Sequence, residues 1–184
     1  MRTVLILLAI ILTGCTSIAV GPAYVGSEKL GYESPYWGGK AEGRAEHGKW
    51  RGVAQVAYYD SQKLETNDGH GARARAMGGL EVARGFVLLG GVTYSTQETS
   101  AWKKEGWAPT IQAEWTDPLG TLIGGVEYLD DSDDKQLIGV LEYRTPGNWP
   151  FFVRFEYVDY ETLFAEGSGR RYEIGFLIPL WRRR

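Results

Sequence analysis

Four segments in the last third of the chain alternate between rows without charge and mixed rows that carry the glutamates and arginines. Glu127, Arg154, Glu156 and Glu173 lie between the uncharged positions. Successive side chains of a strand point to opposite faces of a sheet, so this period of two predicts strands with one apolar face and one mixed, charged face. The uncharged rows are Leu122/Gly124/Val126/Tyr128, Leu137/Gly139/Leu141/Tyr143, Phe151/Val153/Phe155/Tyr157 and Tyr172/Ile174/Phe176/Ile178/Leu180.

The same alternation continues upstream and brings the predicted number of strands to ten, with eight as the alternative count. Pro22, in the first of these segments, should weaken pairing on one side because proline has no backbone N–H to donate. The upstream segments are 18–26, 36–46, 50–59, 72–82, 86–94 and 107–116.

Short and long connections alternate along the chain. An even number of strands, with short turns at one end and longer loops at the other, is typical of transmembrane barrels whose short turns are periplasmic. Strands of about ten residues also match a tilted crossing of the hydrocarbon layer. The sequence therefore predicts an all-β, closed, antiparallel up-and-down transmembrane β-barrel. The short turns are predicted at 47–49, 84–85, 117–120 and 145–149, and the long loops at 27–35, 60–71, 95–106, 129–135 and 161–170.

Residues 1–14 have the pattern of an export signal, with Arg2 followed by a short apolar run. The tetrapeptide Leu12-Thr13-Gly14-Cys15 that ends it resembles the lipobox of bacterial lipoproteins. The resemblance implies cleavage before Cys15, lipid on Cys15, and sorting to the outer membrane by the lipoprotein machinery. An ordinary signal peptide with a chance cysteine is the alternative. Residues 15–184 then form one barrel domain with both ends in the periplasm, without disulfides because Cys15 is the single cysteine.

Aromatic residues indicate which face meets lipid. Tyrosine and tryptophan gather at both ends of the uncharged rows, with aliphatic residues, Ala and Gly between them, as bilayer interfaces select. We therefore expect the uncharged rows to contact outer-membrane lipids. The predicted girdle residues are Trp37, Tyr58, Tyr94, Trp107, Tyr128, Tyr157 and Tyr172 at the outer ends and Trp50, Trp115 and Tyr143 at the inner ends.

The opposite rows would point into the barrel, where acids and bases on neighbouring strands could pair, as buried charges require. The interior of a ten-stranded barrel is small, so such a network is expected to plug the lumen. Lys40, Glu42, Arg44 and Arg144 share these rows. The predicted lumen network is Arg51, Arg73, Arg75, Glu81, Glu114, Glu127, Glu142, Arg154, Glu156, Arg171 and Glu173.

The last strand resembles the signal by which outer-membrane barrels are recognised for insertion. Its polar residue, glycine and two hydrophobic residues are Glu173, Gly175, Ile178 and Leu180. The resemblance implies the barrel-insertion machinery as a partner. Many members of that class end on an aromatic residue, whereas this sequence continues past Trp181 into three arginines.

Two rival interpretations use other residues. Gly48-Lys49-Trp50 and Val158-Asp159-Tyr160 resemble lipocalin motifs, which implies a barrel with an apolar ligand cup. A lipid-active enzyme would need a His–Ser pair, for which His70 with Ser61 or Ser95 is the candidate. The acidic run 130–134 lacks the spacing of a defined calcium loop, so no metal site is predicted.

These observations predict an outer-membrane barrel lipoprotein with a charged, plugged lumen. It would act as a surface, structural or interaction protein through its extracellular loops, where an extracellular partner could bind. We expect no enzyme activity and no cofactor, and the mild net charge of -3 gives no nucleic-acid footprint. A narrow passive channel for small solutes and a lipocalin-like carrier of hydrophobic ligands stay as alternatives.

Overall fold

Eleven strands form one sheet in the computed structural model, which describes residues 17–28, 36–60, 69–99, 103–131, 134–147, 150–162 and 166–182. The strands are β1 (Ser17–Glu28), β2 (Tyr36–His47), β3 (Trp50–Asp60), β4 (Gly69–Ala83), β5 (Phe86–Thr99), β6 (Lys103–Asp117), β7 (Gly120–Asp131), β8 (Asp134–Arg144), β9 (Phe151–Thr162), β10 (Glu166–Phe176) and β11 (Ile178–Arg182).

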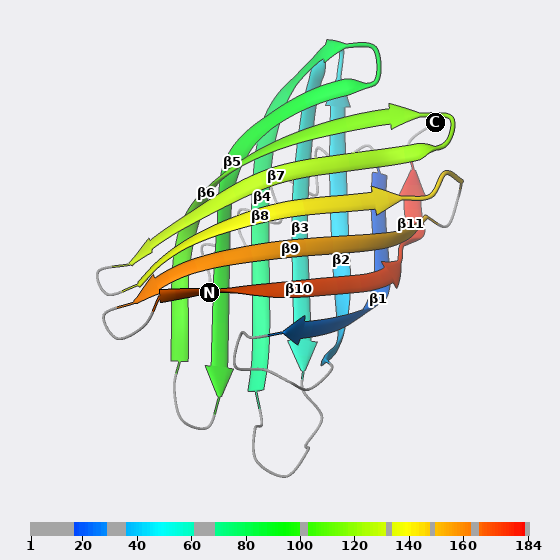
Figure 1. The fold of residues 1–184 in the computed structure, drawn as a ribbon. Helices are drawn as coiled ribbons and strands as arrows, with labels where there is room; N and C mark the ends of the chain where they lie inside the picture. Colours follow the sequence, from blue (N-terminus) through cyan, green and yellow to red (C-terminus); the bar gives the residue numbers. More distant parts are fainter. Residues whose placement is uncertain are drawn as a thin grey trace, which may run out of the picture.

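The sheet closes on itself into a barrel. Each strand from β1 to β9 pairs antiparallel with the next, and β1 also pairs antiparallel with β10. β11 continues beyond β10 and pairs with the start of β1, so β10 and β11 together make one side of the wall (Figure 1). The prediction of a closed, ten-stranded antiparallel barrel is confirmed.

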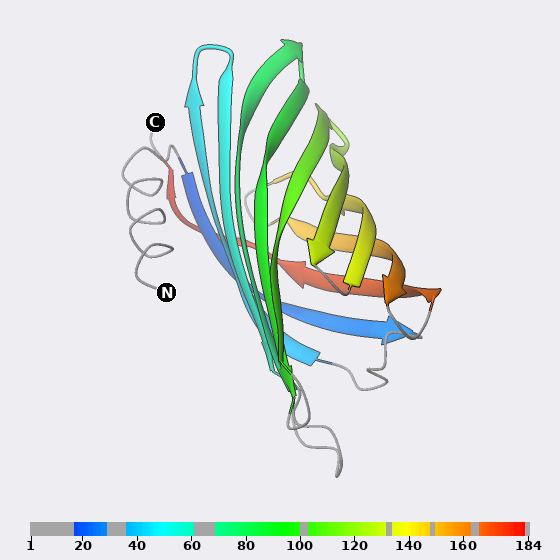
Figure 2. The ribbon, with the colours of Figure 1, turned by 90° about the vertical axis from the view of Figure 1, so that its left-hand side faces the viewer.

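The strands are strongly tilted relative to the barrel axis. In Figure 1, β7–β10 cross in front of β2–β5 at a steep angle, as the tilt of strands in a closed barrel requires. The β2–β3 and β4–β5 hairpins stand together at the top of Figure 2. We call this end of the barrel the short-turn rim and the opposite end the loop rim.

Local chemistry forms the tight turns of the short-turn rim. Gly48 and Gly85 have φ angles of 57° and 75°, a region that glycine enters without the steric cost of a Cβ. At the β6–β7 turn, the Asp117 carboxylate accepts hydrogen bonds from the backbone N–H groups of Leu119 and Gly120 at 2.7 and 3.1 Å.

The seam between the first and last strands contains an interruption at Pro22. β1 pairs with β10 from Ala23 onward and with β11 up to Val20, whereas its ladder with β2 continues through Pro22. The N–H of Leu177, across the gap, instead donates to the Pro150 carbonyl at 3.0 Å. The expectation that Pro22 weakens pairing on one side is confirmed.

Several strands are longer than predicted. β5 continues to Thr99 and β6 begins at Lys103, so the predicted loop 95–106 is wrong over most of its length. The predicted loop 60–71 is also too long, because His70 already lies in β4. Beyond the apolar band both faces of a strand are polar. The hydrophobic alternation therefore disappears there, although the backbone ladder continues.

The predicted export signal and lipid-modified Cys15 lie in residues 1–16, outside the described residues. Over the described ranges, no helix is long and apolar enough to cross a membrane.

Candidate functional site

The two faces of the wall have opposite chemistry. On β9, Phe151, Val153, Phe155 and Tyr157 are exposed, whereas the Arg154 side chain between them is only 2% exposed. The alternation of β9 therefore places its aromatic row outside the barrel and its charged row inside.

Large apolar side chains cover the exterior. Ile111 of β6 is 69% exposed and lies midway between two exposed tryptophans, Trp107 and Trp115. Such a contiguous apolar exterior marks a surface that contacts something other than water. The exposed apolar residues of the strands include Leu80, Val82, Leu88, Val92, Leu122, Val126, Leu137, Leu141, Val153, Phe155, Ile174, Phe176 and Leu180.

Most predicted girdle residues have exposed side chains. Tyr94 is half-buried, and its ring lies 4.9 Å from that of Trp107, with the planes inclined by 47°. The hydroxyl of Tyr143 donates to the carbonyl of Leu119 at 2.6 Å, close to the short-turn rim. Trp37 lies in β2, but its side chain is outside the described residues. The exposed members are Trp50, Tyr58, Trp107, Trp115, Tyr128, Tyr143, Tyr157 and Tyr172.

The half of the lumen nearer the loop rim is organised around two carboxylates, Glu127 and Glu156. Arg73 spans from β4 to both of them, at 2.9 Å to Glu127 and 2.5 Å to Glu156. Arg75 also binds Glu127 from the same strand. Arg154 donates its Nε–H to Glu156 at 2.7 Å, and Arg171 approaches the other Glu156 oxygen at 3.4 Å.

The half of the lumen nearer the short-turn rim joins β2 to the opposite wall. Arg144 of β8 donates two hydrogen bonds of 2.7 Å to the Glu42 carboxylate on β2, a bidentate pair. Arg44 donates to Glu114 of β6 at 2.7 and 3.2 Å. Lys40 lies 3.3 Å from Glu142 of β8, and this carboxylate also binds Arg144.

Neutral polar side chains fill the gaps between these charges. Gln55 donates to Glu42 at 3.0 Å and Gln112 donates to Glu114 at 2.7 Å. Thr93 and Thr110 share a hydrogen bond of 2.7 Å, and Arg75 donates to the Thr93 hydroxyl at 3.3 Å. The charges therefore belong to a continuous hydrogen-bonded filling, which is what low dielectric surroundings demand.

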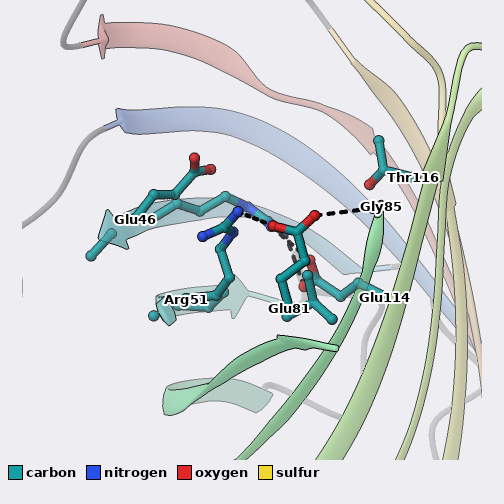
Figure 3. A pocket seen from close by; sticks show the side chains of 11 residues that line it. Glu46, Arg51, Glu81, Gly85, Glu114 and Thr116 are labelled. Carbon is teal, nitrogen blue, oxygen red and sulfur yellow. Dashed lines mark hydrogen bonds and ion pairs between the residues drawn. The ribbon is translucent and has the colours of Figure 1, made fainter. Parts of the chain in front are cut away.

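The structure brings nine of the eleven predicted lumen residues into this network. Arg51 and Glu81 pair with each other near the short-turn rim instead, and Glu81 also accepts from the N–H of Gly85 (Figure 3). The sequence patterns did not indicate the bridges across the lumen or the role of the neutral polar residues. An alternating row shows which face a residue occupies, but not which strand lies opposite.

A small cavity opens beside the Arg51–Glu81 pair, with a volume of about 180 Å³. Figure 3 shows Glu46, Glu114 and Thr116 around it. Within the described ranges, no group of three or more His, Cys, Asp or Glu side chains is placed to hold a metal ion.

The structure contradicts the lipocalin interpretation and leaves the predicted His–Ser pair untested. Phe155 and Phe176 are exposed, whereas Arg154, Glu156 and Glu173 are buried, so the apolar cup of the lipocalin interpretation is wrong. His70 lies on a strand rather than a loop, and its side chain is outside the described residues.

No protein-family model matches the chain, and no curated protein matches it in sequence. Among solved structures it is similar to Neisserial surface protein A, with 9% identity over 88% of this chain and 95% of that one and a TM-score of 0.41. It is similar to Ail, the attachment invasion locus protein of Yersinia pestis, with 14% identity over 89% and 97% of the chains and a TM-score of 0.36. It is also similar to the KdgM porin in complex with disordered oligogalacturonate, with 13% identity over 88% and 97% of the chains and a TM-score of 0.44. At these identities and scores, the similarities define no ligand or activity for this chain.

Proposed function

We propose that the protein is an outer-membrane β-barrel with a closed lumen, which serves as a surface or structural protein. The observation that carries the proposal is the inversion of its wall, with exposed Ile111 and Val126 outside and buried Glu127 and Arg154 inside. A barrel stable in water would place its charged rows outside, because burying charge is costly and exposing it is not. Acyl chains reverse that preference, and a closed sheet suits them because it pairs backbone N–H and C=O groups between neighbouring strands.

The filling of the lumen supports a closed barrel over an open pore. Bridges from β2 to β8 and from β4 to β7 and β9 cross the interior, and the buried side chains in them leave little path for a solute. The bridges from β2 to β8 and from β4 to β7 are each held by more than one hydrogen bond or ion pair. Opening a path would therefore require several buried charges to separate together.

The remaining parts of the proposal concern the ends of the barrel. Lipid on Cys15 would anchor the start of the mature chain at the periplasmic side, and the loops at the loop rim would meet extracellular partners. The enclosed hydrogen-bonded barrel would hold these loops in place, as rigid scaffolds do for loops that carry function.

Single-channel recording tests the closed lumen. We expect purified protein in a planar bilayer to give no discrete conductance steps, while an open porin inserted in the same membrane gives steps of the usual size. A variant with Glu42→Gly and Arg144→Gly removes the bidentate bridge between β2 and β8 and should conduct measurably. Discrete steps from the unaltered protein would establish the narrow-channel alternative.

A further inference from the structure

The ion pairs of the lumen are asymmetric in exposure. Towards the loop rim, the Arg171 side chain is 24% exposed, whereas its partner Glu156 is 2% exposed. Towards the short-turn rim, Arg44 is 27% exposed and its partner Glu114 is 4% exposed. In both halves the guanidinium group faces the accessible space and the carboxylate lies behind it.

Cations also outnumber carboxylates in the connected network of the described residues. Seven cations and six carboxylates take part, which leaves one positive charge in excess. The cations are Lys40, Arg44, Arg73, Arg75, Arg144, Arg154 and Arg171, and the carboxylates are Glu42, Glu114, Glu127, Glu142, Glu156 and Glu173.

In the half nearer the loop rim, four arginines contact two carboxylates. Arg73, Arg154 and Arg171 all contact Glu156, and Arg154 also reaches Glu142 of the adjoining layer at 3.3 Å. Glu127, the neighbouring acid, is already shared by Arg73 and Arg75. An uncompensated cation inside a low-dielectric barrel is costly, so this cluster favours an additional negative charge.

Some buried polar atoms of the network make no hydrogen bond within the described residues. These are the Nη2 group of Arg154, which lies 3.8 Å from Glu127, and the Oε1 atom of Glu173. Arg171 makes one hydrogen bond there, at 3.4 Å, the longest contact to Glu156. A guanidinium carries five N–H donors in a fixed fork, so four donors of the partly exposed Arg171 make no hydrogen bond within the described residues.

We propose that the half of the lumen nearer the loop rim binds a small oxyanion from solution, held by Arg171 and assisted by Arg73. Both arginines are the partly exposed members of the cluster, and both touch Glu156. Guanidinium groups pair with the oxygens of phosphate, sulfate or carboxylate through two parallel hydrogen bonds. The barrel wall excludes much of the water that would screen this attraction.

The site is entered from the loop rim. Arg73 lies four residues from the start of β4 and Arg171 five residues from the start of β10, and both strands start at that rim. The cross-lumen layer of Lys40, Glu42, Glu142 and Arg144 lies beyond the site and is more deeply buried. The ligand therefore binds at a closed end rather than passing through, which rests on the proposed closed lumen. Phosphate binding and conductance are measured separately, so either can fail without the other.

Titration with inorganic phosphate tests the site on the purified full-length chain in an uncharged detergent, with chloride holding the ionic strength constant. We expect saturable calorimetric binding of one phosphate per chain. Arg171→Gln should weaken that binding at least about tenfold, because it removes the open guanidinium. Arg170→Gln is the matched control, since it makes the same charge change at the adjacent, outward-facing position. We expect it to change affinity by less than about twofold.

Three results would overturn the proposal. The first is no saturable binding to the unaltered protein, and the second is an equal loss in Arg170→Gln, which would indicate general surface attraction. The third is undiminished binding to folded Arg171→Gln. Heat-modifiable migration on a gel establishes that each variant has folded. If Arg171→Gln does not fold, Arg171→Lys keeps the charge but loses the fork, and unchanged phosphate affinity in that variant would exclude the guanidinium site.

Discussion

The outer and inner faces of the barrel wall use neighbouring residues of the same strands under opposite rules. On β7, Val126 is exposed and Glu127 beside it is buried, and on β6 the same holds for Ile111 and Gln112. One step along the backbone thus separates an apolar side chain that meets the surroundings from a polar one that does not. The difference is the one expected if the surroundings of this barrel are less polar than its interior, as the proposed membrane location requires.

The two faces also differ in what determines the type of residue that a position tolerates. An outer residue needs only to be apolar, since many apolar side chains suit an acyl-chain environment. An inner charged residue needs named partners, because a buried charge that loses its partner keeps the cost of its burial. Substitutions on the two faces should therefore differ in size as well as in cause.

Removal of the Glu127 carboxylate from the inner face should give the largest loss in the free energy of unfolding. Glu127→Gln leaves Arg73 and Arg75 without their shared anion, and loss of a partner from a buried ion pair costs about 3–5 kcal/mol. Val126→Ala, at the adjacent outer position, should cost about 1 kcal/mol or less, the typical effect of a point substitution. Unfolding by urea in lipid vesicles, followed by tryptophan fluorescence, gives both values. Equal losses would contradict the distinction between the faces.

A charge placed on the outer face tests what that face contacts. Ile111→Arg puts a guanidinium midway between Trp107 and Trp115 and should cost about 2–4 kcal/mol at the centre of a bilayer. Leu119→Arg makes a comparable change in the exposed β6–β7 turn and should cost about 0–1 kcal/mol, as at an interface. The same vesicle unfolding assay applies. Two small and similar effects would mean that the outer face contacts water, which would remove the membrane proposal.

The sequence was sufficient to predict which face each residue occupies. The uncharged row through Phe155 and the charged row through Arg154 lie on the predicted faces, and the ten-stranded closed barrel follows from their repetition. Period-two alternation carries this information because it reflects the pleat of the strand itself. The interrupted pairing at Pro22 was predictable for the same local reason, the missing backbone N–H.

The partners across the lumen could not be predicted in this way. Arg144 binds Glu42, a residue 102 positions earlier in the chain, because β8 lies opposite β2 in the closed barrel. Which strands face one another depends on the tilt and stagger of the whole sheet, which no single segment encodes. The strand ends near Thr99 and Lys103 escaped prediction because polar residues occupy both faces there.

Alanine substitutions at adjacent glycines compare the space available on the two faces of the wall. A Cβ on inward-facing Gly79 or Gly91 would lie 1.8 or 2.1 Å from a backbone carbonyl oxygen of the neighbouring strand, whereas a Cβ on outward-facing Gly78 or Gly90 would meet no atom within 4 Å. Gly79→Ala should therefore cost about 1–3 kcal/mol through overpacking and backbone shift. Gly78→Ala should be neutral or stabilise by up to about 1 kcal/mol, since glycine weakens a strand interior.

A second pair of glycines, Gly90 and Gly91 on β5, tests whether the difference in stability depends on the face that a residue occupies rather than on β4 alone. Gly91→Ala should reproduce the loss of Gly79→Ala, and Gly90→Ala should reproduce the tolerance of Gly78→Ala, in the same vesicle unfolding assay. Similar losses at all four positions would mean that the wall excludes side chains on both faces. The outward glycines would then be required by something packed against the barrel in the membrane, because no atom of the described chain occupies that space.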